Sequence, residues 1–196
     1  MTTRLDIINA MLGVNGETPV DSVGSNNPAA IQANNALNRI DKKVQARGWW
    51  FNKEDIVLSP SESTGAITLP SNTLSADPVD TKSQYVQRGT TLYDKKNNTS
   101  VISTTVNTTL VLQLAIEELP EVAASYIMDK AVKEYYIDDD GDEQKINRLD
   151  RRESESFAYL QREHLANVDT NIRRSPLGAQ LLKETHGNTT YIDTGA

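Results

Sequence analysis

Cysteine is absent from this sequence of 196 residues, and aromatic residues make up only 6% of it. Without a thiol, the chain has no disulfide, thiolate metal ligand or cysteine nucleophile, which suits folding in a reducing cytosol. Only two histidines are present, His164 and His186, and they lack the His/Glu spacing typical of zinc sites. The fold must therefore be stabilised by packing within the chain or against neighbouring molecules.

Positive charge is also in deficit, with 20 Lys and Arg against 27 Asp and Glu and a net charge of −7. This balance argues against nonspecific binding to nucleic acid, which depends on cations that neutralise phosphates. No window approaches the roughly 20 apolar residues that span a bilayer, and no signal peptide is evident, so we expect neither membrane insertion nor secretion. Because phosphate-binding loops and G-x-S-x-G motifs are also missing, we predict no catalytic residue, no cofactor and no metal site.

Helical periodicity occupies both ends of the sequence. The spacing of apolar residues predicts helices over residues 3–14, 28–47, 120–136 and 143–169. Asn27 is placed to cap the second helix, and Pro28 stands in its first turn, where a missing N–H costs nothing. Gly48 is placed to end that helix. Pro120 marks the start of the third helix in the same way.

The middle of the sequence has the pattern of short strands separated by turns. We predict strands at residues 49–51, 56–58, 66–69, 85–88, 91–93, 101–105 and 110–114. Prolines and glycines separate these segments, and Gly89 predicts a tight hairpin. The arrangement predicts an antiparallel sheet or a small barrel-like insertion.

Together these elements predict an α+β fold, in which helices from both ends of the chain form one bundle around an inserted antiparallel β region. We place the first part of the bundle at residues 1–48, the β insertion at 49–118 and the second part of the bundle at 119–171. Residues 172–196 contain few large apolar side chains and are interpreted as an extended arm. Arms of this composition usually require a partner to become ordered.

Carboxylates are the remaining candidates for chemistry in this sequence. The acidic run at residues 138–143 does not match a calcium loop, because an EF-hand aligned on Gly141 would end at Asn147 instead of Glu. We interpret it as a solvated loop between helices. A glycosidase needs only two carboxylates about 5–10 Å apart, so Glu54 with Asp55, or Asp77 with Asp80, keeps a glycan hydrolase open as an alternative.

Candidate interface residues cluster where the second helix meets the β region. Arg47, Trp49 and Trp50 belong to the most distinctive segment, which either packs in the core or anchors a neighbouring subunit, since Trp and Arg are enriched at interface hot spots. Glu153 and His164 fall on the apolar face of the last helix, where an unpaired polar group would be costly. We therefore expect this face to meet something polar. The arm adds three further candidates, Arg173, Arg174 and Tyr191.

Three segments of the sequence are similar to one protein family. Residues 30–52, with Leu37-Asn38 and Arg47-Gly48-Trp49, resemble the second helix and the helix-to-strand junction of tail tubular protein A from short-tailed bacteriophages. Residues 8–20 resemble the first helix and turn of that family, and residues 119–131 resemble its third helix. The order and spacing agree over about residues 4–137, and none of these motifs is catalytic.

The resemblance implies a virion structural protein and not an enzyme. It implies a dodecameric homo-oligomeric ring beneath the portal protein, with the nozzle protein, tail tubular protein B, below it and tail fibres near the junction. Genomic DNA would pass through during ejection without specific binding, which an acidic surface favours. We expect the protein in the virion tail, and in the host cytoplasm during assembly. The alternatives are the tail-associated glycan hydrolase and a free-standing regulatory or binding module.

Overall fold

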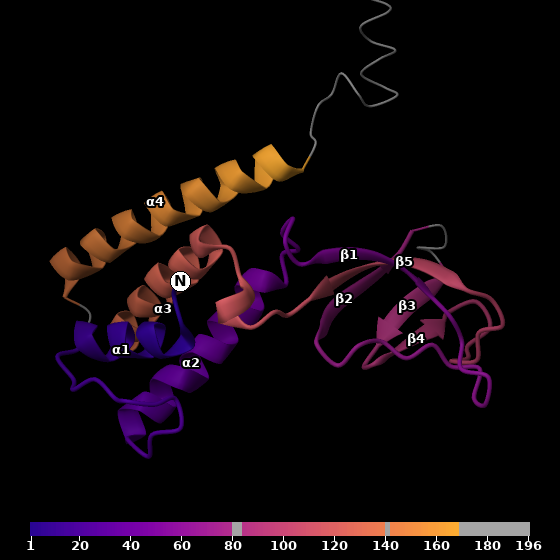
Figure 1. Ribbon diagram of the computed structural model, residues 1–196, viewed down its shortest axis with the longest axis horizontal. Coiled ribbons are helices and arrows are strands. Elements are labelled where there is room, and N and C mark those ends of the chain that lie inside the picture. Colours follow the sequence, from indigo (N-terminus) through magenta and orange to yellow (C-terminus); the bar gives the residue numbers. More distant parts are fainter. Residues whose placement is uncertain (80–83, 140–141, 169–196) are drawn as a thin grey trace, which may run out of the picture.

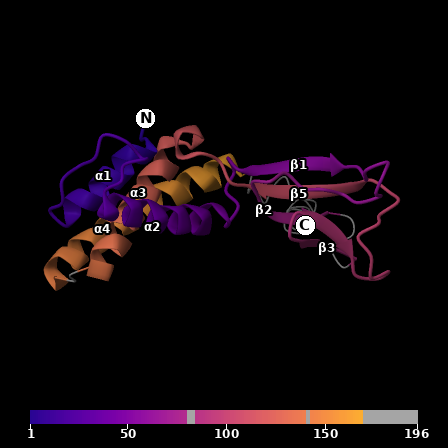
Figure 2. The same cartoon turned by 90° about the horizontal axis from the view of Figure 1, so that it is seen from below.

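The computed structural model describes residues 1–79, 84–139 and 142–168, and in these residues the chain forms two parts that lie side by side (Figure 1). Four α-helices make one part and five β-strands make the other. Figure 2 shows the same separation from below, with the helices at one end and the strands at the other. The predicted α+β class is confirmed.

The first two helices begin at local capping signals. In α1 (Arg4–Val14), the side chains of Thr3 and Asp6 form a capping box with the backbone of the first turn. In α2 (Pro28–Gln45), the side-chain oxygen of Asn27 accepts a hydrogen bond of 2.9 Å from the amide of Ala29. The predicted cap and first-turn proline of the second helix are therefore confirmed.

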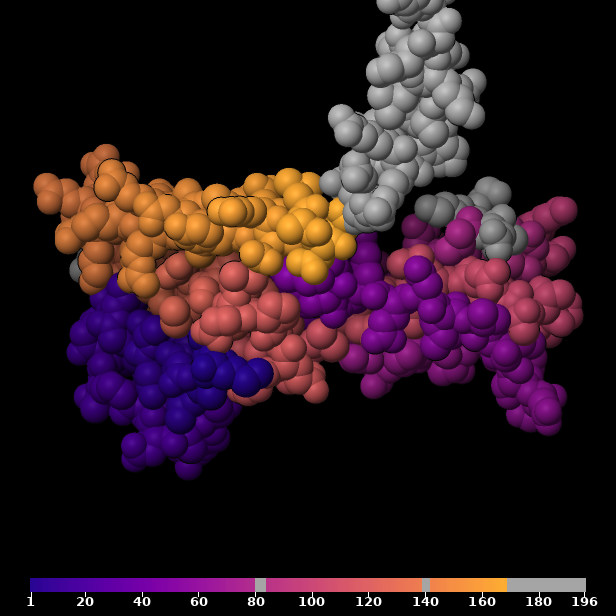
Figure 3. Space-filling view, turned by 45° about the horizontal axis from the view of Figure 1, so that its top comes forward, coloured from indigo at the N-terminus to yellow at the C-terminus, as the bar shows by residue number. Residues whose placement is uncertain are grey.

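The last two helices form a hairpin on one side of the bundle. α3 (Glu121–Asp139) follows Pro120, and α4 (Glu143–Asn167) follows Asp142, whose carboxylate caps the amide of Gln144. α3 packs against each of the other three helices, whereas α4 packs mainly on α3 and lies across the surface, as the orange and yellow atoms of Figure 3 show. No helix in the described ranges is long and apolar enough to cross a membrane.

Each part has its own hydrophobic core. The bundle core includes fully buried side chains from all four helices, among them Ile7, Leu12, Leu37, Ile127 and Leu160. The β region has a smaller core. Its members are Leu58, Ile67, Leu69, Leu92, Ile102, Val106, Leu110 and Leu112. The predicted division of the chain into residues 1–48, 49–118, 119–171 and 172–196 remains a proposal.

The β region contains a three-stranded antiparallel sheet of order β1-β5-β2, with β1 (Lys53–Leu58), β2 (Thr73–Pro78) and β5 (Val106–Leu112). β3 (Tyr85–Arg88) and β4 (Thr91–Asp94) form a separate hairpin. Gly89 occupies the turn of that hairpin with φ +59°, so the predicted tight turn is confirmed.

Three of the strand predictions are wrong, and one strand was not predicted. Residues 49–51 form a turn, in which the amide of Asn52 donates to the carbonyl of Trp49 at 3.3 Å. Residues 66–69 and 101–105 contribute only isolated bridges. β2 was not predicted, because the prolines of this region were interpreted as separating the strands. Pro78 instead ends β2 and is buried. The predicted arm, residues 172–196, lies outside the described residues.

Candidate functional site

Two chain segments join the helical bundle to the β region, and they lie side by side. The first leaves α2 at Gln45 and enters β1 at Lys53, and the second leaves β5 at Leu112 and leads toward α3. Gly48 bends the first segment with φ +72°, a conformation that favours glycine. A Cβ atom there would lie 2.6 Å from Cε of Lys53 and 3.1 Å from Cγ2 of Val111, so this position also needs the missing side chain.

Asn52 ties these two segments together from a position that is 1% exposed. Its Oδ1 accepts a hydrogen bond of 2.8 Å from the Trp49 amide. Its Nδ2 donates to the carbonyls of Gln45 and Leu112, both at 2.9 Å. The side-chain amide therefore uses both of its N–H donors and its acceptor on backbone groups of both connections.

Gln45 makes a second set of links between the same segments. Its side chain is fully buried, and its amide both accepts from the Leu114 N–H and donates to the Leu114 carbonyl, each at 2.9 Å. Its Nε2 also donates to Asp41 at 2.7 Å, and Gln113 Nε2 donates to the other oxygen of Asp41 at 2.9 Å. We call Asp41, Gln45, Asn52 and Gln113 the junction clamp. A satisfied buried network of this kind fixes one arrangement of the segments that it joins.

Aromatic side chains pack the end of α4 against this junction. Trp49 is 5% exposed, and its indole Nε1 donates to the carbonyl of Val44 at 2.8 Å. Its ring meets the ring of His164 edge-on, at a centroid separation of 5.3 Å, and that of Phe157 at 6.4 Å. The ring of Trp50 lies 6.1 Å from that of His164. The turn at residues 49–51 is therefore held by α2 and α4 together.

An ion-pair cluster links α3 and α4 farther along the bundle. Glu153 of α4 binds Lys130 at 2.8 Å and also contacts Lys133, which binds Asp150 at 2.8 Å. Burial disfavours the charged form of Glu153, but hydrogen bonds from the two lysines outweigh burial and lower the pKa of its carboxyl below 4.5. The same contacts outweigh burial of Lys130 and Lys133 and raise the pKa of both amines above 10.5.

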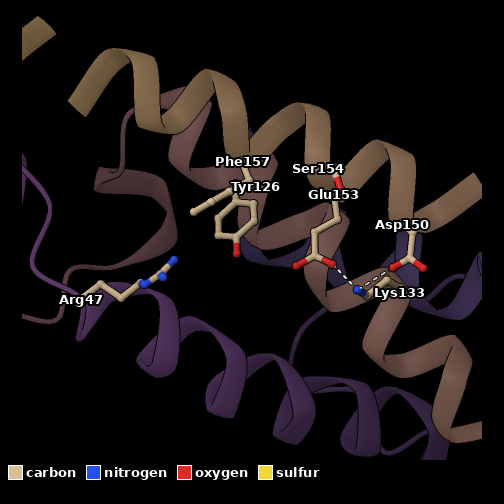
Figure 4. Close-up of a pocket in the computed structure, with 7 residues that line it drawn as sticks. All are labelled: Arg47, Tyr126, Lys133, Asp150, Glu153, Ser154 and Phe157. Atoms are coloured by element: carbon tan, nitrogen blue, oxygen red, sulfur yellow. Dashed lines mark hydrogen bonds and ion pairs between the residues drawn. The ribbon is translucent and has the colours of Figure 1, made fainter. Parts of the chain in front are cut away.

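A surface groove of about 300 Å³ lies between the ion-pair cluster and the junction (Figure 4). Its lining residues are Arg47, Tyr126, Lys133, Asp150, Glu153, Ser154 and Phe157. A second hollow of about 320 Å³, lined by Lys43, Val44, Arg47, Tyr126 and Lys130, shares two of these residues. The guanidinium of Arg47 lies 5.3 Å from the centroid of the Phe157 ring. Cationic and aromatic groups of this kind bind carboxylates of a partner better than they bind a metal ion.

Comparison with known proteins identifies the family of this chain. The family model described as tail tubular protein matches residues 5–172. The chain belongs to the tail tubular protein family. It is also 30% identical, over 164 residues, to tail tubular protein A of Klebsiella phage KP34, a match that covers 84% of this chain and 88% of the relative. The chain is thus a structural protein of a bacteriophage tail, and the resemblance that the sequence indicated is confirmed.

Of the predicted interface residues of this tail protein, Arg47, Trp49, Trp50 and His164 are brought together at the junction. Glu153 lies nearby in the groove and binds α3. Their participation in contacts between subunits remains a proposal. Arg173, Arg174 and Tyr191 lie outside the described residues.

The junction clamp was not identified from the sequence. Its members are polar residues on or beside apolar segments. The sequence shows only that Asp41 and Gln45 are spaced i, i+4 on one predicted helix, where their side chains can meet. The partners Gln113 and Leu114 lie about 70 positions later, so the hydrogen bonds depend on tertiary structure. Lys130 and Lys133 were missed for the same reason, because their partner Glu153 belongs to another helix.

Three of the carboxylates that could serve a glycan hydrolase, Glu54, Asp55 and Asp77, are exposed on β1 and β2. Glu54 and Asp55 are neighbours on β1 and therefore point to opposite faces. Asp55 and Asp77 both pair with Thr109, on either side of β5, and Asp55 accepts a hydrogen bond of 2.6 Å from the Thr109 hydroxyl. Asp80 lies outside the described residues. Among those residues, no group of three or more His, Asp or Glu side chains is arranged to hold a metal ion.

Proposed function

We propose that this tail protein is the subunit of a dodecameric ring that joins the portal protein to the tail nozzle, and that it is not an enzyme. The observation that carries the proposal is the family match over residues 5–172. The relative from Klebsiella phage KP34 bears the name tail tubular protein A, the type of protein for which this role is expected. The virion tail is then the site of action, after assembly in the host cytoplasm.

The architecture of the chain supports such a role. A closed ring of identical subunits requires every subunit to present its two contact surfaces at the same angle. The junction clamp holds the bundle and the β region in one orientation through Gln45 and Asn52, which are both buried. We propose that the bundles pack side by side, while the β region faces the nozzle protein and the fibres attach near the junction.

The net charge of −7 supports a further part of the proposal. A ring with an acidic surface repels the phosphates of DNA, which weakens nonspecific adhesion. Genomic DNA would therefore pass through the ring without specific binding. Portal protein, nozzle protein and tail fibres are the proposed partners.

Negative-stain images of the purified chain, alone and mixed with the portal and nozzle proteins of the same phage, test the proposal. We expect rings of this chain stacked between portal and nozzle. A chain that joins neither protein under conditions in which both are correctly assembled would refute the adaptor role.

The alternative is a tail-associated glycan hydrolase. Asp55→Asn and Asp77→Asn variants, assayed for cleavage of host surface oligosaccharide, separate the two functions. We expect no cleavage by the wild type or by either variant. Cleavage that is reproducibly lost in one variant, with rings intact, would refute the purely structural role.

A further inference from the structure

Two cations of the groove have no acidic partner within the described ranges. Lys43 and Arg47 project from the last turn of α2 and the residues after it, and both are exposed. The guanidinium of Arg47 lies within 6.0 Å of the Trp49 ring centroid and closer to that of Phe157, which restricts its orientation. The groove therefore presents a preorganised guanidinium and a nearby ammonium.

The acidic residues of the groove are already bound within the bundle. Glu153 and Asp150 are held by Lys130 and Lys133. Tyr126, which is 5% exposed, lines the groove between Arg47 and Glu153 (Figure 4). A ligand that enters from outside would thus meet the two free cations and a tyrosine, and carboxylates have the complementary charge.

A surface of complementary charge on this chain lies where α3 ends and α4 begins, which we call the tip of the α3–α4 hairpin. Asp138, Asp142 and Glu143 are exposed there. In Figure 1 this tip lies at the end of the bundle that is away from the β region. Phe157 lies 14 positions after Glu143 in α4, a rise of about 21 Å at 1.5 Å per residue. The tip of one copy therefore cannot reach the groove of the same copy.

We propose that the acidic tip of one copy of this chain docks in the groove of the next copy, with carboxylates of the tip bound to Lys43 and Arg47. This inference rests on the proposed ring. Such a contact is heterologous, because each copy binds one neighbour through its tip and the other neighbour through its groove, as a closed ring requires.

Charge reversal provides the test, using the full chain and the ring assay with portal. The groove variant carries Lys43→Glu with Arg47→Glu, and the tip variant carries Asp138→Lys with Glu143→Lys. We expect each variant alone to lose at least tenfold in ring yield, because like charges then meet at every contact. An equimolar mixture should recover rings, since alternating copies restore opposite charges at every contact.

Controls separate this contact from general effects of charge and stability. Lys95→Glu with Lys96→Glu changes the net charge as much as the groove variant does, but in the turn after β4, and should form rings as the wild type does. Thermal unfolding of each monomer shows whether the variants fold. Rings from either variant alone, or folded variants whose mixture forms none, would overturn the docking contact. Failure of the wild type to form rings would instead overturn the proposed function.

Discussion

Asn52 allows the strongest test of the junction clamp, because one side chain there satisfies groups on two connecting segments. Asn52→Ala removes the acceptor of the Trp49 amide and the donors to the carbonyls of Gln45 and Leu112. The Gln45 carbonyl keeps a hydrogen bond from Gly48. The buried amide of Trp49 loses its side-chain partner, so the largest single cost arises there.

The magnitude follows from these three contacts. Each hydrogen bond contributes about 1 kcal/mol net, and a buried amide left without a partner costs about 1–3 kcal/mol. We therefore expect Asn52→Ala to lower the free energy of unfolding by about 4 kcal/mol. For a chain of this size, each 1 kcal/mol lowers the melting temperature by about 2–4 °C, which predicts a shift of about 8–16 °C.

Thermal denaturation followed by circular dichroism measures this shift, with Asn72→Ala as the matched control. The side chain of Asn72 also donates a hydrogen bond to the second connection, to the carbonyl of Gln113 at 3.0 Å, but Asn72 is exposed to water. We expect that control to cost less than about 1 kcal/mol. Equal melting temperatures for the two variants would show that the clamp does not stabilise the junction.

Two further substitutions test the contacts of α4. Because the pKa of Glu153 is lowered in the folded state, its stabilising effect is present above pH 4.5 and is lost as pH falls through the folded pKa. Urea unfolding at pH 7 should therefore give Glu153→Gln a free energy of unfolding about 2 kcal/mol lower than that of the wild type. This difference should become smaller below pH 4.5. A difference that does not change with pH would contradict the ion-pair assignment. Leu160→Ala should lower the free energy of unfolding by about 2–5 kcal/mol, because Leu160 is fully buried. Leu165→Ala should have little effect, because Leu165 is 58% exposed. Equal losses for the two variants would contradict the packing of α4 against the bundle core through Leu160.

Local chemistry determined the helices of this protein. Asn27 with Pro28, Pro120 and the periodic apolar residues act within a few positions of one another, so the sequence predicted all four helices. The Gly89 turn was predicted for the same reason, because a position with positive φ favours glycine whatever the tertiary structure around it. The resemblance to the tail tubular proteins likewise depended on the order of such local segments.

Tertiary structure decided the strand pairing and the junction. Residues 49–51 have the aromatic composition of a strand, but the hydrogen bond from the Trp49 amide to Asn52 stabilises a turn there. β2 is defined by its pairing with β5, about 30 positions later, which no local pattern around Pro78 indicates. The sequence alone thus determined the helices and the protein family. The site depended on contacts between distant segments, because a buried polar side chain is stabilised only by the partners that folding brings to it.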